Sequence, residues 1–208
     1  MSGNLIIISS PSGGGKGTLI NKVLASSPEI TLSVSYTTRQ IRPGEEDGRE
    51  YFFVSKEEFE RLIDEGEFLE HAVVHGNYYG TSLAQVRKVM EAGKDIILEI
   101  DVQGAETIFS KMPEVVGIFI LPPSYEVLES RLTRRGTEKK DEIDVRLENS
   151  FVEIEKYTLF RYSVVNDDIQ RASDIIIGII NAERNRTDRQ LGVITDILRS
   201  FEAAKSSR

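Results

Sequence analysis

A glycine-rich segment near the N-terminus constrains the fold of this chain more than any other feature. It reads Ser10-Pro11-Ser12-Gly13-Gly14-Gly15-Lys16-Gly17-Thr18 and follows a short apolar run, Leu5–Ile8. After it, apolar residues recur at helical spacing, at Leu19, Ile20, Val23 and Leu24. Consecutive glycines let backbone N–H groups converge on one anion, and the start of a helix adds its dipole. The pattern therefore predicts a buried strand, a phosphate-binding loop and a helix, with Lys16 directed at the terminal phosphates of a nucleoside triphosphate.

This loop departs from the usual phosphate-loop pattern at two positions. The usual pattern is glycine, four residues, Gly-Lys, and then serine or threonine. Here Ser10 replaces the first glycine and Gly17 replaces the hydroxyl residue, so the hydroxyl group moves to Thr18. A Mg²⁺ ion that accompanies the triphosphate would then be held through water and nucleotide oxygens. The alternative, a glycine-rich turn with a solvated lysine, is disfavoured by the strand before the loop and the helix after it.

Similar apolar runs recur along the chain and alternate with helical patterns. Strands are predicted at Ile96–Ile100, Val116–Leu121 and Tyr162–Val165, and helices at Tyr125–Arg134, Asp144–Tyr157 and Ser173–Arg186. This alternation favours an α/β fold whose three-layer core has a parallel sheet covered on both faces. The segment Thr31–Met90 differs, because it combines turn signals with short aromatic strands such as Tyr51–Val54. We interpret it as an inserted α+β subdomain.

The composition excludes several classes of protein. The 208 residues contain no cysteine, which rules out disulfide scaffolds, thiol nucleophiles and thiolate metal sites. A formal net charge of −8 disfavours a general nucleic-acid binder. No apolar run approaches the roughly 20 residues of a membrane span, and the N-terminus lacks the features of a secretory signal. We therefore expect one cytoplasmic domain that binds neither nucleic acid nor membranes and handles anions with a few placed cations.

A second anion-binding pattern lies at Ser33–Glu45. Arg39 and Arg42 stand three residues apart in a hydroxyl-rich segment that runs into a Pro-Gly turn. Two guanidinium groups can hold a phosphate monoester from two sides, and Ser35 and Tyr51 are further donors. Taken alone, the pattern also fits turn arginines that pair with the neighbouring glutamates and contribute little to stability.

Downstream motifs complete a resemblance that extends from about Leu5 to about Arg184. It is carried by the phosphate loop, S-x-S-x-T-T-R-x-x-R-x-G-E (33–45), E-F-L-E (67–70), G-N-Y-Y-G-T (76–81), I-D-x-Q-G (100–104) and V-N-D-D (165–168). In order and spacing these segments resemble guanylate kinases of the bacterial type, which are nucleoside monophosphate kinases with a P-loop fold. The resemblance implies transfer of the γ-phosphoryl group of ATP to GMP, and to dGMP, giving ADP and GDP in purine nucleotide metabolism, with Mg²⁺ accompanying the ATP.

The resemblance also implies a division of the chain and a set of site residues. Within one domain over 1–208, it gives a core (1–32, 91–123 and 157–186), a GMP-binding subdomain (33–90), a helical lid (124–156) and a C-terminal helical tail (187–208). The implied ATP-binding residues are Ser10, Pro11, Ser12, Gly13, Gly14, Gly15, Lys16, Gly17, Thr18 and Asn166. The implied GMP-binding residues are Ser35, Arg39, Arg42, Tyr51, Glu70, Tyr79, Gly80, Thr81 and Asp101. The implied catalytic residues are Lys16, Arg39, Asp101, Arg131, Arg135 and Arg146, with Arg134 as a bystander.

The chemistry of guanine supports one of these assignments independently. Guanine presents its N1–H and N2–H₂ donors side by side, and an ionised carboxylate accepts both. We expect Glu70 to do this, with Thr81 serving O6 or the remaining amine proton. Adenine, which has an acceptor at N1, would leave the carboxylate unpaired at a cost of about 1–3 kcal/mol. The alternative for Glu70 is a surface glutamate beside a core Leu69.

Acidic residues end the strand predicted at Ile96–Ile100. Ligands of open α/β sheets bind outside the carboxyl ends of strands, so Asp101 is placed to face the waters of Mg²⁺ or to orient an arginine. The family usually has another aspartate two residues earlier, where this chain has Glu99, and a structural ion pair is the alternative for that residue. We predict no direct side-chain ligand to the metal, and Thr18, Glu99 and Asp101 are candidates through water.

Three further features have competing interpretations. Arg131 and Arg135 share a helical face that is either a solvated surface or part of the lid over the transferring phosphoryl group. His71 and His75 have i, i+4 spacing but lack a third ligand, so a metal site is disfavoured. The tail either caps the core, which we favour, or forms an oligomer contact, so the oligomeric state stays open. Its apolar residues at helical spacing are Leu191, Ile194, Ile197, Leu198 and Phe201.

Two other classes of function also stay open. Guanylate kinase-like domains of scaffold proteins bind partners without catalysis, but their phosphate loops are typically eroded, whereas Lys16 and the three glycines before it are present here. A sister phosphotransferase with another acceptor is disfavoured by Glu70, Thr81 and the arginine pair.

Overall fold

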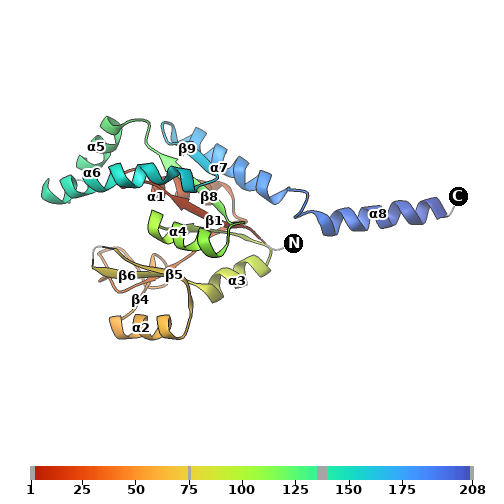
Figure 1. Cartoon of the computed structure of the whole chain (residues 1–208), viewed down its shortest axis with the longest axis horizontal. Coiled ribbons are helices and arrows are strands. Elements are labelled where there is room, and N and C mark those ends of the chain that lie inside the picture. Colours follow the sequence, from red (N-terminus) through yellow and green to blue (C-terminus); the bar gives the residue numbers. More distant parts are fainter. Residues whose placement is uncertain (1–2, 75, 135–139, 207–208) are drawn as a thin grey trace.

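The computed structural model describes residues 3–74, 76–134 and 140–206, and this part of the chain builds two sheets (Figure 1). The larger sheet has five strands in the order β2-β7-β1-β8-β9, and every neighbouring pair is parallel. Its strands are β1 (Leu5–Ser9), β2 (Ile30–Leu32), β7 (Asp95–Glu99), β8 (Val116–Leu121) and β9 (Tyr162–Val165). The predicted α/β fold with a parallel core sheet is confirmed.

The first strand shows why both faces of this sheet are covered. Because side chains alternate between the faces of a strand, Ile6 and Ile8 point into one apolar cluster and Leu5 and Ile7 into the other. The first cluster packs against α1 (Lys16–Ser26) and α7 (Ile169–Arg184), and the second against α3 (Leu83–Glu91) and α4 (Val102–Lys111). The sheet is therefore the middle of three layers, and the carboxyl ends of its strands lead into loops that are free to bind ligands.

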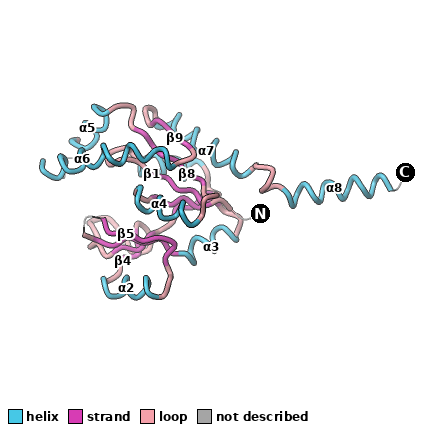
Figure 2. The backbone as a smooth tube through the Cα atoms, in the orientation of Figure 1, coloured by secondary structure: helices cyan, strands magenta, loops and turns pink. Residues whose placement is uncertain are grey.

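The second sheet has four strands in the order β4-β3-β6-β5 and lies on the α3 and α4 side of the core (Figure 2). Its strands are β3 (Ser35–Thr37), β4 (Tyr51–Phe53), β5 (Phe68–Val74) and β6 (Asn77–Ser82), and α2 (Lys56–Asp64) covers its outer face. The rings of Phe59 on α2 and Phe68 on β5 stack with centroids 4.6 Å apart. A Cβ on Gly80 would lie 2.9 Å from both rings, so this glycine is required by aromatic packing.

Between β8 and β9, the described residues form α5 (Tyr125–Thr133), α6 (Lys140–Glu155) and a short 3₁₀ turn, η1 (Lys156–Leu159). The predicted helix ends differ from those observed by a few residues. For example, α7 begins at Ile169 rather than Ser173, because the Asp168 carboxylate accepts the Arg171 N–H at 2.7 Å and caps the helix earlier. The division of the chain into core, subdomain, lid and tail stays a prediction.

The expectation that the C-terminal tail caps the core is wrong. Helix α8 (Leu191–Ser206) has no buried residue and extends away from the sheets (Figure 1). The chain is attached to the core just before this helix, where Arg189 donates to the Asn4 side chain and to the Gly3 carbonyl oxygen. Beyond that point the apolar side chains of Leu191, Leu198 and Phe201 are exposed. Among the described residues, no helix is long and apolar enough to cross a membrane.

Candidate active site

The phosphate loop lies where β1 gives way to α1, as the sequence predicts. Gly13 and Gly15 have φ angles of 87° and 85°, which only glycine adopts without strain. A Cβ on Gly15 would also lie 2.5 Å from the Nδ2 atom of Asn166. Asn166 is buried, and its Nδ2 donates to the Gly14 carbonyl oxygen at 2.9 Å. The end of β9 therefore holds the loop in shape, which requires glycine at these positions.

Lys16 opens α1 and points toward the end of β7. Its ammonium group donates to the Ile100 carbonyl oxygen at 2.9 Å. Burial lowers the pKa of Lys16, and the nearby carboxylates of Glu99, Asp101 and Glu153 oppose this effect. The Lys16 ammonium group is thus surrounded by carboxylates, and a phosphate bound to the loop would contact this group.

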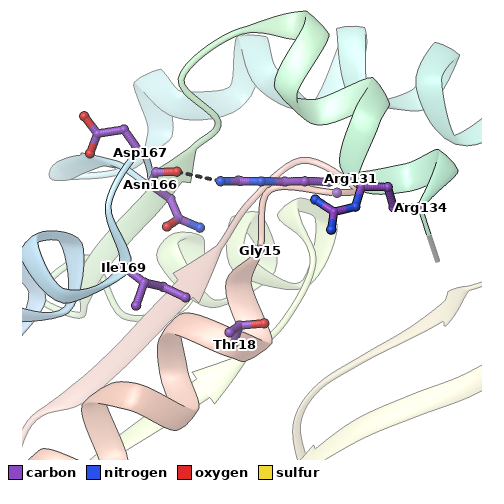
Figure 3. Close-up of a pocket in the computed structure, with 8 residues that line it drawn as sticks. Gly15, Thr18, Arg131, Arg134, Asn166, Asp167 and Ile169 are labelled. Carbon is purple, nitrogen blue, oxygen red and sulfur yellow. Dashed lines mark hydrogen bonds between the residues drawn. The ribbon is translucent and has the colours of Figure 1, made fainter.

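A cavity of about 400 Å³ opens beside the loop (Figure 3). It is lined by Gly13, Gly15, Thr18, Arg131, Arg134, Asn166, Asp167 and Ile169. Arg131 projects from α5 across the loop and donates to the Asn166 carbonyl oxygen at 2.8 Å and to that of Gly14 at 3.3 Å. Arg134 lines the same cavity, and its role as a bystander in catalysis stays a prediction.

Helix α6 touches the loop from the other side. The Ser12 N–H donates to Oε2 of Glu153 at 2.8 Å, and Nε of Arg146 donates to the Ser12 hydroxyl at 2.8 Å. Burial raises the pKa of Glu153, while the Ser12 N–H and the cations of Lys16 and Arg146 lower it. Arg135, another predicted lid arginine, lies outside the described residues.

Of the two arginines that follow β3, Arg39 is half-buried and Arg42 is exposed. Arg39 donates to both carboxylate oxygens of Glu45, at 2.8 and 3.0 Å, and its guanidinium lies 5.3 Å from the centre of the Tyr51 ring. Tyr51 and Tyr79 meet edge to face, with centroids 5.8 Å apart. Arg42 is exposed on the turn and donates its backbone N–H to Glu45. The glutamate pairing considered from the sequence is therefore present for Arg39, beside two phenol rings.

Glu70 is not a surface glutamate. Its side chain is 5% exposed, and the Thr81 hydroxyl, which is fully buried, donates to its Oε1 at 2.6 Å. Burial raises the pKa of Glu70, and the hydrogen bond from Thr81 partly offsets this. A Cβ on Gly104 would lie 3.0 Å from Oε2 of Glu70 and 3.5 Å from Oδ1 of Asp101. The lack of a side chain at Gly104 thus leaves a space that the carboxylates of Glu70 and Asp101 both border.

The acidic residues after β7 have different surroundings. Asp101 is the N-cap of α4, and its Oδ1 accepts the Gly104 N–H at 2.8 Å. Glu99 is exposed and makes no ion pair with another described residue, so the structural pairing considered for it is not seen. Its Oε1 lies 3.5 Å from the position of a Cβ on Gly17. The longer glutamate therefore reaches toward the place where the usual hydroxyl residue is missing.

Oxygen donors near the loop suit a hard cation. Mg²⁺ prefers oxygen ligands and keeps several of its waters, and the Glu99 and Asp101 carboxylates and the Thr18 hydroxyl are of this kind. Among the described residues, no group of three or more His, Asp or Glu side chains could hold a metal ion by itself. His71 is exposed, and its predicted companion His75 lies outside the described residues.

Some residues at the site were missed by the sequence interpretation. Asp167 and Ile169 line the cavity, Gly104 makes room for Glu70, and Glu153 binds the phosphate loop. For Glu153 a signal was available, because it follows Arg146 by seven residues and so shares its helix face. Gly80 is also required by its packing against Phe59 and Phe68, and its predicted part in GMP binding stays a prediction.

Comparison with known proteins agrees with this geometry. A family model described as guanylate kinase matches residues 2–183. The guanylate kinase of Neisseria gonorrhoeae is 52% identical over 196 residues, which cover 94% of this chain and 96% of that protein. The guanylate kinase of Caldanaerobacter subterraneus subsp. tengcongensis is 49% identical over 187 residues, or 90% and 91% of the two chains. The crystal structure of guanylate kinase from Anaplasma phagocytophilum is similar with a TM-score of 0.77 at 39% identity and covers 96% of this chain and 95% of that one.

The comparisons thus point to one family along nearly the whole chain. The geometry agrees with it, since the structure combines a phosphate loop, arginines that lie over this loop and a buried carboxylate at the neighbouring sheet. The chain belongs to the guanylate kinase family, the phosphotransferases that move the γ-phosphoryl group of ATP to GMP.

Proposed function

We propose that this chain phosphorylates GMP, and dGMP, with Mg²⁺-bound ATP by means of the residues described above. ATP would lie along the phosphate loop, with its phosphates on the loop N–H groups and Lys16, and its nucleoside in the cavity beside Arg131 and Asn166. The carboxyl ends of β1, β7 and β9 converge on this loop, which is where open α/β sheets bind ligands. The reaction would serve purine nucleotide recycling in the cytoplasm.

The observation that carries the acceptor assignment is the buried Glu70–Thr81 pair. A carboxylate that is 5% exposed needs hydrogen-bond donors, and Thr81 supplies its hydroxyl and its backbone N–H, whereas a carboxylate has about four acceptor sites. Guanine offers two adjacent donors, N1–H and N2–H₂, which match the remaining acceptor capacity of the carboxylate. Adenine offers an acceptor at the position of N1 and would leave Glu70 unpaired.

The acceptor phosphate would be held by the hydroxyl and guanidinium groups at the other end of the small sheet. The proposed ligands are Ser35, Arg39, Arg42, Tyr51 and Tyr79, with Gly80 and Asp101 nearby. Arg39 would exchange the Glu45 carboxylate for the phosphate, which replaces one charged, bidentate acceptor by another. Because Arg42 is exposed, it can turn toward the phosphate without breaking a buried contact.

The transfer itself needs positioning and charge neutralisation rather than a proton acceptor. The attacking oxygen of a phosphate monoester is already ionised, so no residue is assigned as a general base. Lys16 and the arginines of the lid, Arg131, Arg135 and Arg146, would neutralise the charge that spreads over the equatorial oxygens. When bound, Mg²⁺ would supply further neutralisation of the phosphates, and Glu99, Asp101 and Thr18 would hold it through its waters. We also propose that the subdomain (33–90) and the lid (124–156) close over the substrates and exclude water.

Calorimetric titration with GMP, IMP and AMP tests the acceptor assignment. IMP keeps the N1–H donor and lacks the exocyclic amine, so it isolates one of the two donors that Glu70 would accept. We expect IMP to bind roughly 10- to 150-fold more weakly than GMP, which corresponds to one hydrogen bond to a charged group, and AMP to bind more weakly still. Equal affinity for GMP and IMP would refute the assignment of Glu70 to both donors.

A further inference from the structure

Ser12 is bound twice by the same helix. Its backbone N–H donates to Oε2 of Glu153, and its hydroxyl accepts from Nε of Arg146, both at 2.8 Å. Glu153 and Arg146 belong to α6, whereas Ser12 lies in the phosphate loop, 141 and 134 residues away in the sequence. One loop residue therefore ties α6 to the phosphate loop at two points.

The spacing of the two residues makes this tie specific. Seven residues are almost two full turns, so both side chains leave α6 on one face, about 10 Å apart along the helix axis. They contact two different groups of Ser12, its backbone N–H and its hydroxyl. Sliding α6 by one residue in either direction, or rotating it, would break one of the two bonds. The pair thus fixes where the guanidinium group of Arg146 stands relative to the loop.

The electrostatics of the site do not favour a negative charge at Glu153. Burial raises its pKa, so the protein keeps a carboxyl group where its charge is unfavourable. The Asp101 carboxylate raises the pKa further, and the cations of Lys16 and Arg146 act in the opposite direction. A negative charge beside a phosphate loop also repels a phosphate. The hydrogen bond that Glu153 accepts from the Ser12 N–H therefore accounts for this residue better than its negative charge does.

We propose that Glu153 is a positioning residue for phosphoryl transfer, which holds α6 on the Ser12 N–H so that Arg146 stays aligned with the phosphate loop. This inference rests on the proposed role of Arg146 in neutralising the transferred group. Glu153 itself touches the loop backbone and no reacting atom. Its contribution therefore belongs in kcat rather than in the affinity for GMP.

Two substitutions separate reach from charge. Glu153→Gln keeps the length and the acceptor oxygen but removes the charge, whereas Glu153→Asp keeps the charge and shortens the side chain by one methylene, about 1.5 Å. We expect Glu153→Gln to remain within a few-fold of the parent kcat. We expect Glu153→Asp to lose roughly 10- to 100-fold in kcat, with the KM for GMP unchanged, because small displacements of a catalytic group have effects of this size. Glu148→Gln, an exposed glutamate on the same helix, is the matched control and should leave kcat unchanged.

A double-mutant cycle tests whether Glu153 acts through Arg146. If it does, Glu153→Asp combined with Arg146→Ala loses no more kcat than Arg146→Ala alone. Additive losses would overturn the inference, and so would an active Asp variant or an inactive Gln variant. If Arg146→Ala itself retains the full kcat, the proposed role of Arg146 fails. If Arg146→Ala is impaired and Glu153→Asp is not, the inference alone fails.

Discussion

Replacing Glu70 by glutamine changes one functional group of the proposed guanine site, and the contacts of Glu70 in the structure predict the effect. Glutamine has the same length, and its amide oxygen can still accept the Thr81 hydroxyl that Oε1 of Glu70 accepts at 2.6 Å. Its NH₂ group, however, cannot accept the second donor of guanine and faces it with hydrogens instead. We therefore expect Glu70→Gln to weaken GMP binding and to narrow the preference for GMP over AMP.

The size of the effect follows from the number of bonds lost. One hydrogen bond to a charged group contributes about 1.5–3 kcal/mol, which corresponds to roughly 10- to 150-fold in the dissociation constant of GMP. The unliganded protein should respond in the opposite direction. Because burial raises the pKa of Glu70, its carboxylate destabilises the empty fold, and the neutral amide relieves this penalty. We expect the melting temperature of the unliganded variant to equal or exceed that of the parent.

Calorimetric titration with GMP and AMP, together with thermal unfolding of the unliganded proteins, measures both effects. Glu67→Gln is the matched control, because Glu67 is an exposed glutamate three residues before Glu70. It should change neither quantity. A dissociation constant for GMP that is unchanged in Glu70→Gln would refute the assignment of guanine to this carboxylate. A lower melting temperature would refute the argument that the buried charge is unfavourable in the empty site.

Three further predictions concern protonation, the phosphate loop and packing. Since burial raises the folded-state pKa of Glu70, its contribution to the stability of the empty protein is present at low pH and is lost as the pH rises through that pKa, whereas GMP affinity should fall on acidification. The ratio of the GMP dissociation constants of the parent and Glu70→Gln, measured against pH, cancels the titration of the GMP phosphate near pH ~6. A ratio that does not change with pH would show that Glu70 is not responsible. Lys16→Met should lower kcat roughly 100- to 1000-fold and leave GMP affinity nearly unchanged, and a near-normal rate would remove Lys16 from the mechanism. Gly80→Ala should lower the free energy of unfolding by about 1–3 kcal/mol, because its Cβ would lie 2.9 Å from the rings of Phe59 and Phe68. Gly178→Ala, on the exposed face of α7 where a Cβ meets no atom within 4 Å, should raise it by about 0.5–1 kcal/mol, and denaturant titration that gives both variants the same sign would contradict the packing argument.

The core of the fold was predictable because its signals are local. Leu5–Ile8 is a continuous apolar run, which fits a strand covered on both faces, and the loop that follows has the glycines that its positive φ angles require. The pairing of Arg39 with Glu45 was also foreseeable, since both belong to one turn. In each case the interacting residues are near one another in the sequence.

The features that the sequence did not reveal depend on residues far apart in the chain or on the absence of a partner. The bond between Ser12 and Glu153 spans 141 residues. The seven-residue spacing from Arg146 indicates which helix face Glu153 occupies, but nothing local identifies Ser12 as its partner. Gly104 matters through the space that it leaves for Glu70, which becomes visible only when α4 and β5 are packed together. The amphipathic pattern of α8 shows which face is apolar but not whether another element covers it, and the expectation of a core contact was therefore wrong.

We propose that this chain transfers a phosphoryl group from ATP specifically to guanine nucleotides. The most direct test is to measure ADP formation by the purified protein with Mg²⁺ and ATP, offering GMP, dGMP, AMP, UMP and CMP in parallel. We predict rapid ADP formation with GMP and dGMP alone. Comparable turnover of AMP would contradict the role of Glu70, and GMP binding without any turnover would contradict the claim that the chain is a phosphotransferase.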